Sequence, residues 1–182
     1  MKISKSDYVE LLRKVFFLAM KAGYASDGAK LRVKELPGSR LFTFEYEDSG
    51  QKFTVSDLYF VTPNSLMSFG TTIIACQSYP SWYMQYHGEY DNVAVPLLKQ
   101  ALRKTYEAEA FLGGRGLQIH LPVGDLAYEP DQRDLVYTNS IEENDFCNFS
   151  GREEIRNLNT LKSYGWHRYT GSLMISDSWF DV

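Results

Sequence analysis

Between residues 31 and 88 the sequence alternates apolar and polar side chains with a period of two, and short turns such as Pro37-Gly38-Ser39 interrupt it. This alternation predicts strands that each bury one face. The predicted strands span residues 31–36, 41–46, 52–61, 68–76 and 82–88. Parallel neighbours would need long crossover connections, so turns this short predict an antiparallel meander.

Two stretches with helical periodicity each precede a set of predicted strands. The first spans residues 4–22, where Ser4 and Asp7 form a start that resembles a capping box. The second spans residues 93–112, with Pro96 in its first turn. After it we predict strands at 117–121, 135–138 and 161–175, an acidic loop at 124–134 and a polar, irregular stretch at 141–159.

Short aromatic and glycine motifs recur in the same order after each predicted helix. The two sets are Phe69-Gly70, Trp82 and Tyr86-His87-Gly88, and then Phe149-Ser150-Gly151, Trp166 and Tyr169-Thr170-Gly171. They predict an α+β fold of two pseudo-repeated helix-plus-meander halves, at about 1–90 and 91–175. The halves would supply one antiparallel sheet or two, packed with two long helices, within a single domain over residues 1–182.

Composition and charge narrow the class of protein. The chain has 19 Lys and Arg against 23 Asp and Glu, and no basic stripe, so no nucleic-acid partner is expected. No apolar run is long enough to span a bilayer, and no signal peptide precedes the first helix. We therefore expect a cytoplasmic protein without a membrane partner, in which Cys76 and Cys147 are free thiols.

One acidic residue interrupts an apolar row. In the predicted strand 52–61, Asp57 shares a face with Phe53, Val55, Tyr59 and Val61. An unpaired carboxylate is very costly to bury. Asp57 is therefore either an exposed or hydrogen-bonded side chain, or the polar group of a cavity.

The aromatic strand 82–90 places Trp82, Met84 and Tyr86 on one face. Such a face is core in most proteins, and it becomes a ligand surface where the facing layer leaves space. Adding the similar stretch around Trp166 gives a predicted ligand-binding wall. Its residues are Asp57, Tyr59, Trp82, Met84, Tyr86, Trp166 and Tyr169.

Chemistry-bearing motifs are weak. His87, His120 and His167 lack metal-ligand spacing, and the pairs Glu142-Glu143 and Glu153-Glu154 are interpreted as solvated loop charges. The glycines at 113–116 follow a helix, which is the reverse of the order in a phosphate-binding loop. We expect neither a metal nor a cofactor, and the sequence identifies no catalytic residue.

The chain resembles an uncharacterised bacterial family, a domain of unknown function that occurs alone or behind a helix-turn-helix of the XRE type. The resemblance spans most of the chain. It is carried by Pro37-Gly38-Ser39, Tyr46, Asp57, Tyr59, Phe69, Gly70, Trp82-Tyr83-Met84, Tyr86, Gly88, residues 97–102 and Tyr169-Thr170-Gly171. It implies no established activity, but its link to DNA-binding modules implies a sensory role.

These observations favour a small-molecule-binding or sensory module without catalysis, with a small apolar or aromatic ligand. Two alternatives stay open. One is an enzyme with an Asp/His site in a cleft, which two histidines and a carboxylate close together would support. The other is a protein-interaction module, such as a homodimer, that uses a sheet edge or the tail Trp179-Phe180.

Overall fold

The computed structural model describes residues 3–23, 25, 28–120 and 134–180, except the side chain of His120. The acidic loop predicted at 124–134, apart from Asp134, and the last residue of the strand predicted at 117–121 lie outside the described residues.

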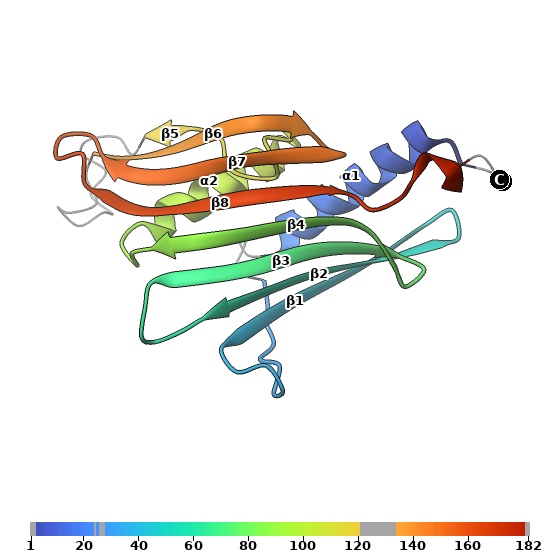
Figure 1. Cartoon of the computed structure of the whole chain (residues 1–182), viewed down its shortest axis with the longest axis horizontal. Coiled ribbons are helices and arrows are strands. Elements are labelled where there is room, and N and C mark those ends of the chain that lie inside the picture. The colour runs from blue at the N-terminus through green and yellow to red at the C-terminus, as the bar shows by residue number, and fades with distance from the viewer. Residues whose placement is uncertain (1–2, 24, 26–27, 121–133, 181–182) are drawn as a thin grey trace.

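The described residues form one eight-stranded antiparallel sheet in the order β1-β2-β3-β4-β8-β7-β6-β5 (Figure 1). The first four strands are β1 (Ser39–Asp48), β2 (Gln51–Val61), β3 (Met67–Cys76) and β4 (Tyr79–Tyr90). The others are β5 (Ile119–His120), β6 (Leu135–Asp145), β7 (Asn148–Asn157) and β8 (Ser163–Leu173). Short connections join β1 to β2, β2 to β3, β3 to β4, β6 to β7 and β7 to β8.

The predicted fold class is wrong. The strands do not divide into two halves, because β4 and β8 pair directly, from Trp82 opposite Leu173 to Tyr90 opposite Gly165. The helices are also shorter than predicted, at 18 residues for α1 (Lys5–Ala22) and 13 for α2 (Val95–Glu107). Strand makes up 48% of the described residues and helix 22%, so a single sheet dominates the fold.

Both helices lie behind the sheet in Figure 1, on the same face. In α1 the hydroxyl of Ser4 accepts a hydrogen bond from the Asp7 amide, as predicted, and an apolar stripe that includes Leu12 and Phe16 is buried. The face that α1 and α2 cover, here called the inner face, holds the core. The 3-10 turn η3 (Asp177–Trp179) and Phe180 pack against α1, where the rings of Trp179 and Phe180 contact Tyr8.

Two local predictions are also wrong. Residues 31–36 form only an isolated bridge between Leu31 and Leu41, because five of these six residues are charged or are exposed leucines, and Pro37 follows. Residues 141–159 are not irregular, since they contain the end of β6 and all of β7. Both cysteines are free, as predicted. No helix among the described residues is long and apolar enough to cross a membrane.

Candidate functional site

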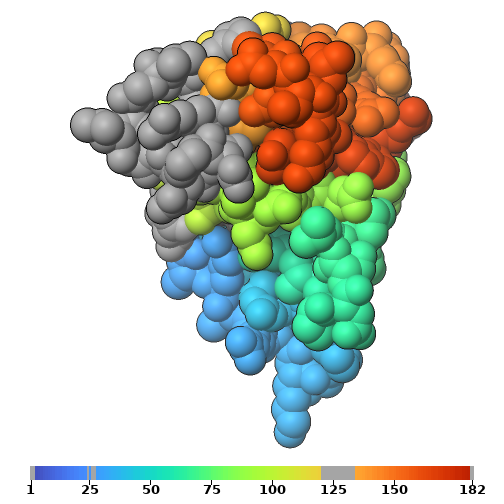
Figure 2. All heavy atoms as spheres, turned by 90° about the vertical axis from the view of Figure 1, so that its left-hand side faces the viewer, coloured from blue at the N-terminus to red at the C-terminus, as the bar shows by residue number. Residues whose placement is uncertain are grey.

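A cavity of about 400 Å³ lies between the inner face of the sheet and α2. One side of α2 lines it, through Val95, Leu98, Leu102 and Tyr106, which recur at helical spacing. Exposed residues at the connection between β2 and β3 also line it, and these are Val61, Thr62, Pro63, Ser65, Leu66 and Met67. Figure 2 looks onto this end of the molecule, where β2 and β4 both end.

The sheet register brings the polar side chains of the site together. Asp57 of β2 lies opposite Thr72 of β3, and Thr72 lies opposite Met84 of β4. The next inner row runs from Tyr59 across Gly70 to Tyr86. A Cβ on Gly70 would lie 2.6 Å from the Tyr86 hydroxyl, so only glycine lets these tyrosine side chains meet over β3.

Asp57 is held by hydroxyl groups. The Tyr86 hydroxyl donates to Oδ1 at 2.8 Å, and Thr72 donates to the same oxygen at 3.0 Å. Burial raises the pKa of Asp57, and the two hydrogen bonds together with the charges of Arg115 and Lys30 offset only part of that rise. The carboxylate is 7% exposed and lines the cavity.

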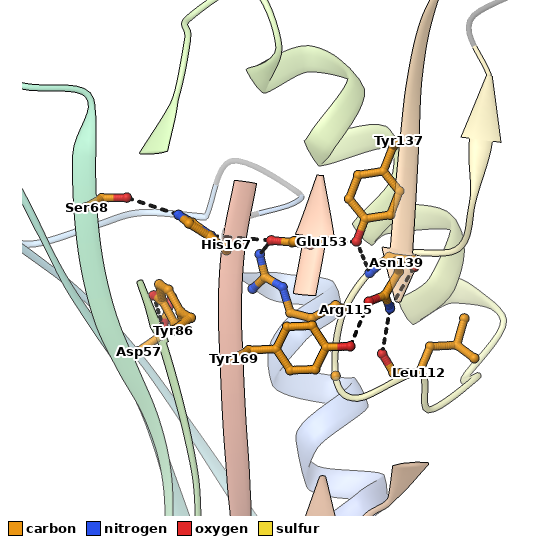
Figure 3. A network of polar contacts seen from close by, with 12 residues as sticks. Asp57, Ser68, Tyr86, Leu112, Arg115, Tyr137, Asn139, Glu153, His167 and Tyr169 are labelled. Atoms are coloured by element: carbon orange, nitrogen blue, oxygen red, sulfur yellow. Dashed lines mark hydrogen bonds and ion pairs between the residues drawn. The ribbon is translucent and has the colours of Figure 1, made fainter. Parts of the chain in front are cut away.

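Arg115 reaches the site from the loop after α2 (Figure 3). This loop turns through Gly113 and Gly114, whose φ angles of 62° and 69° suit glycine. The Asn139 amide donates to the carbonyls of Leu112 and Gly116 at 3.0 and 3.3 Å. The glycine cluster therefore positions the Arg115 guanidinium over the Tyr86 ring, 5.4 Å from the ring centre.

Glu153 of β7 is fully buried, and both of its carboxylate oxygens contact polar side chains. Its Oε1 pairs with Arg115 and lies 3.3 Å from Nδ1 of His167, and its Oε2 accepts from the Tyr137 hydroxyl at 2.5 Å. Burial alone would raise the pKa of Glu153. The charge of Arg115 and the contact with His167 outweigh burial and hold that pKa at about 2.

His167 of β8 connects the Glu153 cluster with the cavity. Its Nε2 lies 3.2 Å from the Ser68 hydroxyl, and its ring contacts those of Tyr86 and Tyr90. Burial lowers the pKa of His167, and Glu153 offsets part of that shift. The imidazole is therefore neutral at pH 7.

No protein-family model matches the chain, and no curated protein or solved structure matches it either. The resemblance to the domain found behind XRE-type modules therefore stays a prediction.

Of the seven residues of the predicted wall, Asp57, Tyr59, Met84 and Tyr86 line the cavity. Trp82 lies in the core, stacked on Phe146 at 5.1 Å, where its indole donates to the Phe146 carbonyl. Tyr169 is buried beside the cavity-lining residues, and its hydroxyl donates to Asn139 at 2.7 Å.

Trp166 lies on the other face of the sheet from the helices. Its ring contacts His87 and Arg152, both of which are exposed. Trp166 and Tyr169 are three residues apart in one strand, and side chains at an odd separation point to opposite faces. The structure therefore does not bring Trp166 to the cavity.

Sequence reasoning missed Arg115, Thr72, Glu153 and His167. The interpretation of Glu153 as a solvated loop charge is wrong, because it occupies a row with Phe149, Gly151 and Ile155, all buried. That row carries the period-two signal that identified Asp57. Arg115 has no such signal, because its position depends on a loop.

The three histidines do not converge among the described residues. His87 is exposed on the face opposite to His167, and the side chain of His120 lies outside the described residues. No group of three His, Cys, Asp or Glu side chains in the described part of the chain could hold a metal ion.

Proposed function

We propose that this protein is a small-molecule-binding or sensory module whose cavity encloses a small ligand without transforming it. The observation that carries the proposal is the cavity of about 400 Å³ with apolar walls and buried polar groups at its base. Ligand sites combine a mostly apolar surface with a few fixed polar groups in this way.

Neighbouring side chains hold the polar groups of the cavity in place. Fixed groups of this kind support a binding site more than polar groups that only contact solvent. Asp57 is fixed by two hydroxyl groups, and Arg115 is fixed by Glu153 and by its glycine loop. Groups held in this way need little reordering when a ligand arrives, which favours affinity.

Native mass spectrometry of the purified protein, with a denatured control, tests the proposal first. We expect a bound small molecule, or else a rise in melting temperature with members of a library of aromatic and apolar compounds. A Leu98→Phe variant should lose both signals, because the larger side chain would fill the cavity. Leu158→Phe, at an exposed turn, is the matched control and should keep them.

An empty protein that no compound stabilises would contradict the proposal. So would binding that Leu98→Phe leaves unchanged, because the ligand would then lie elsewhere.

A specific observation favours hydrolysis as the second candidate function. Ser68, His167 and Glu153 lie in a row across the sheet, with separations of 3.2 Å and 3.3 Å. In such a row the serine oxygen attacks an acyl carbon while Nε2 takes its proton and then passes it to the leaving alcohol. Water would release the acyl group by the same route.

Hydrolysis ranks second because the row is imperfect. Nδ1 of His167 makes no hydrogen bond of good geometry to any described residue, and Glu153 is shared with Arg115 and Tyr137. Hydrolysis of a chromogenic butyrate ester decides the question. A rate above that of buffer that Ser68→Ala removes would establish an esterase. No rate, and no serine adduct with a fluorophosphonate probe, would exclude one.

A further inference from the structure

Asp57 uses only one of its two carboxylate oxygens within the protein. Thr72 and Tyr86 both donate to Oδ1, and no described residue donates to Oδ2. The side chain is more than nine-tenths buried and lines the cavity. When a buried carboxyl ionises, an oxygen without a donor gains most from a charged hydrogen bond.

The charged groups around the cavity leave Asp57 without an ion-pair partner among the described residues. Arg115 and Glu153 form a buried pair and cancel, and His167 is neutral at pH 7. Arg115 and Lys30 attract the Asp57 carboxylate, yet burial still outweighs them. No ion pair with a described residue therefore offsets what burial costs the ionised form of Asp57.

Arg115 offers little to an anionic ligand. Its charge is paired with Glu153, and its Nε, although it has no described hydrogen-bond partner, is exposed by less than 1 Å². A ligand in the cavity cannot reach that atom. An anion would also lie near the Asp57 carboxylate, which repels it.

The surfaces near Asp57 suit a cation attached to an apolar body. Tyr59 and Tyr86 lie on either side of Gly70 in the next inner row and line the cavity, and tyrosine rings attract cations over their faces. On the opposite side, Leu98 and Leu102 of α2 provide an apolar wall. The cavity thus has a negative base and apolar sides.

We propose that the ligand is a small organic amine, protonated at neutral pH, with an aromatic or aliphatic body. Its ammonium group donates to Oδ2 of Asp57, and its body packs against Leu98 and Leu102. This inference rests on the proposed function and adds the chemical class of the ligand. A neutral alcohol could donate one hydrogen bond to Oδ2 but would leave the charge uncompensated.

Three compounds with one shared body test the inference: 2-phenylethylamine, 2-phenylethanol and 3-phenylpropanoate. Affinity is measured by calorimetric titration at pH 7 with wild type, Asp57→Asn and the control Asp48→Asn, a partly exposed residue that does not line the cavity. We expect wild type to bind the amine at least about tenfold more tightly than the alcohol, and the carboxylate least. Asp57→Asn should lower the affinity for the amine by about 10- to 100-fold and change the affinity for the alcohol little. Asp48→Asn should change neither affinity.

Equal affinity for the amine and the alcohol, a preference for the carboxylate, or an amine affinity that Asp57→Asn leaves unchanged would each overturn the inference. If none of the three binds, the amine inference fails, and the library screen with Leu98→Phe still decides the proposed function separately. The wild-type series alone measures the charge preference, so the test does not depend on a variant that folds.

Discussion

Asp57 and Glu153 are both buried carboxylates on the inner face of the same sheet, but their surroundings differ. Glu153 on β7 contacts a guanidinium, an imidazole and a tyrosine hydroxyl, and both of its oxygens are engaged. Asp57 on β2 has two hydroxyl donors on a single oxygen. The pKa of Glu153 is therefore lowered and that of Asp57 is raised.

The difference separates a structural acid from a binding acid. A fully paired carboxylate has no free oxygen that could accept a hydrogen bond from a ligand. Its loss leaves the charge of its partner buried and uncompensated. A buried carboxylate with hydrogen bonds to only one of its oxygens lowers the stability of the empty protein. A cationic ligand that binds the second oxygen offsets this loss of stability. The cavity lies against Asp57, whereas Glu153 is not among the residues that line it.

The largest expected effect is at Glu153. Glu153→Gln should lower the free energy of unfolding by about 3–5 kcal/mol, because it leaves the Arg115 charge buried without its partner. Chemical denaturation at pH 7 measures the change. Glu154→Gln, the next residue along β7, whose side chain points to the other face, is the control and should change stability by less than about 0.5 kcal/mol. An equal loss of stability in Glu153→Gln and Glu154→Gln would contradict the structural role of Glu153.

Two tyrosine hydroxyls give a matched pair. Tyr137→Phe removes a group that bonds both Glu153 and the Gly116 amide, and should lower the free energy of unfolding by about 2–3 kcal/mol. Tyr86→Phe removes the bond to Asp57 at the edge of the cavity, where water can replace it, and should cost about 1 kcal/mol. Denaturant titration compares the two, and a larger loss for Tyr86→Phe would contradict the account.

Asp57→Asn should make the empty protein more stable at pH 7, by about 0.5–2 kcal/mol, because it replaces a carboxyl whose ionised form burial disfavours with a neutral amide that still accepts from Thr72 and Tyr86. The gain should appear as a higher denaturation midpoint. A loss of stability would mean that the carboxylate is already compensated within the protein.

The two acids should also respond to pH with opposite signs. The folded pKa of Asp57 lies above its unfolded value near 3.8, so its ionisation lowers stability above the raised pKa, and stability returns as pH falls through it. The folded pKa of Glu153, about 2, lies below its unfolded value of 4.5, so its contribution is present above pH 4.5 and is lost toward pH 2. Denaturation of wild type and both variants from pH 7 to pH 3 separates the two.

The smallest expected effect is at Trp166. Trp166→Ala should lower the free energy of unfolding by less than about 1 kcal/mol, through loss of its contacts with His87 and Arg152. It should leave ligand affinity unchanged, because the indole lies on the face away from the cavity. A loss of affinity in a titration would show that both faces of the sheet take part in binding.

The sequence predicted the part of the fold that depends on local pattern. Four of its five predicted early strands lie within β1 to β4, and alternation alone placed Asp57 in an apolar row. The pairing of β4 with β8 joins residues about 80 positions apart, and no local pattern specifies such a pairing. This is why the sequence suggested two pseudo-repeated halves and left open whether they form one sheet or two.

The site was predicted only where one strand carried the whole signal. Trp82 shares a face with Met84 and Tyr86, but α1 covers it through Phe16, and that contact is not visible in the strand itself. Glu153 could have been found by the alternation of Phe149, Gly151 and Ile155. Arg115 could not, because its place depends on a loop that Asn139 and Tyr137 hold from a different part of the chain.

The most direct test is a carboxyl titration of the empty protein by ¹³C NMR, with Asp57→Asn and Glu153→Gln used to assign the two signals. The account predicts that Asp57 titrates above the ordinary aspartate pKa of 3.8 and that Glu153 titrates near 2. Added 2-phenylethylamine should then lower the pKa of Asp57 and leave that of Glu153 in place. An Asp57 carboxyl that titrates at or below 3.8 without ligand would contradict the claim that this acid is left for a cation.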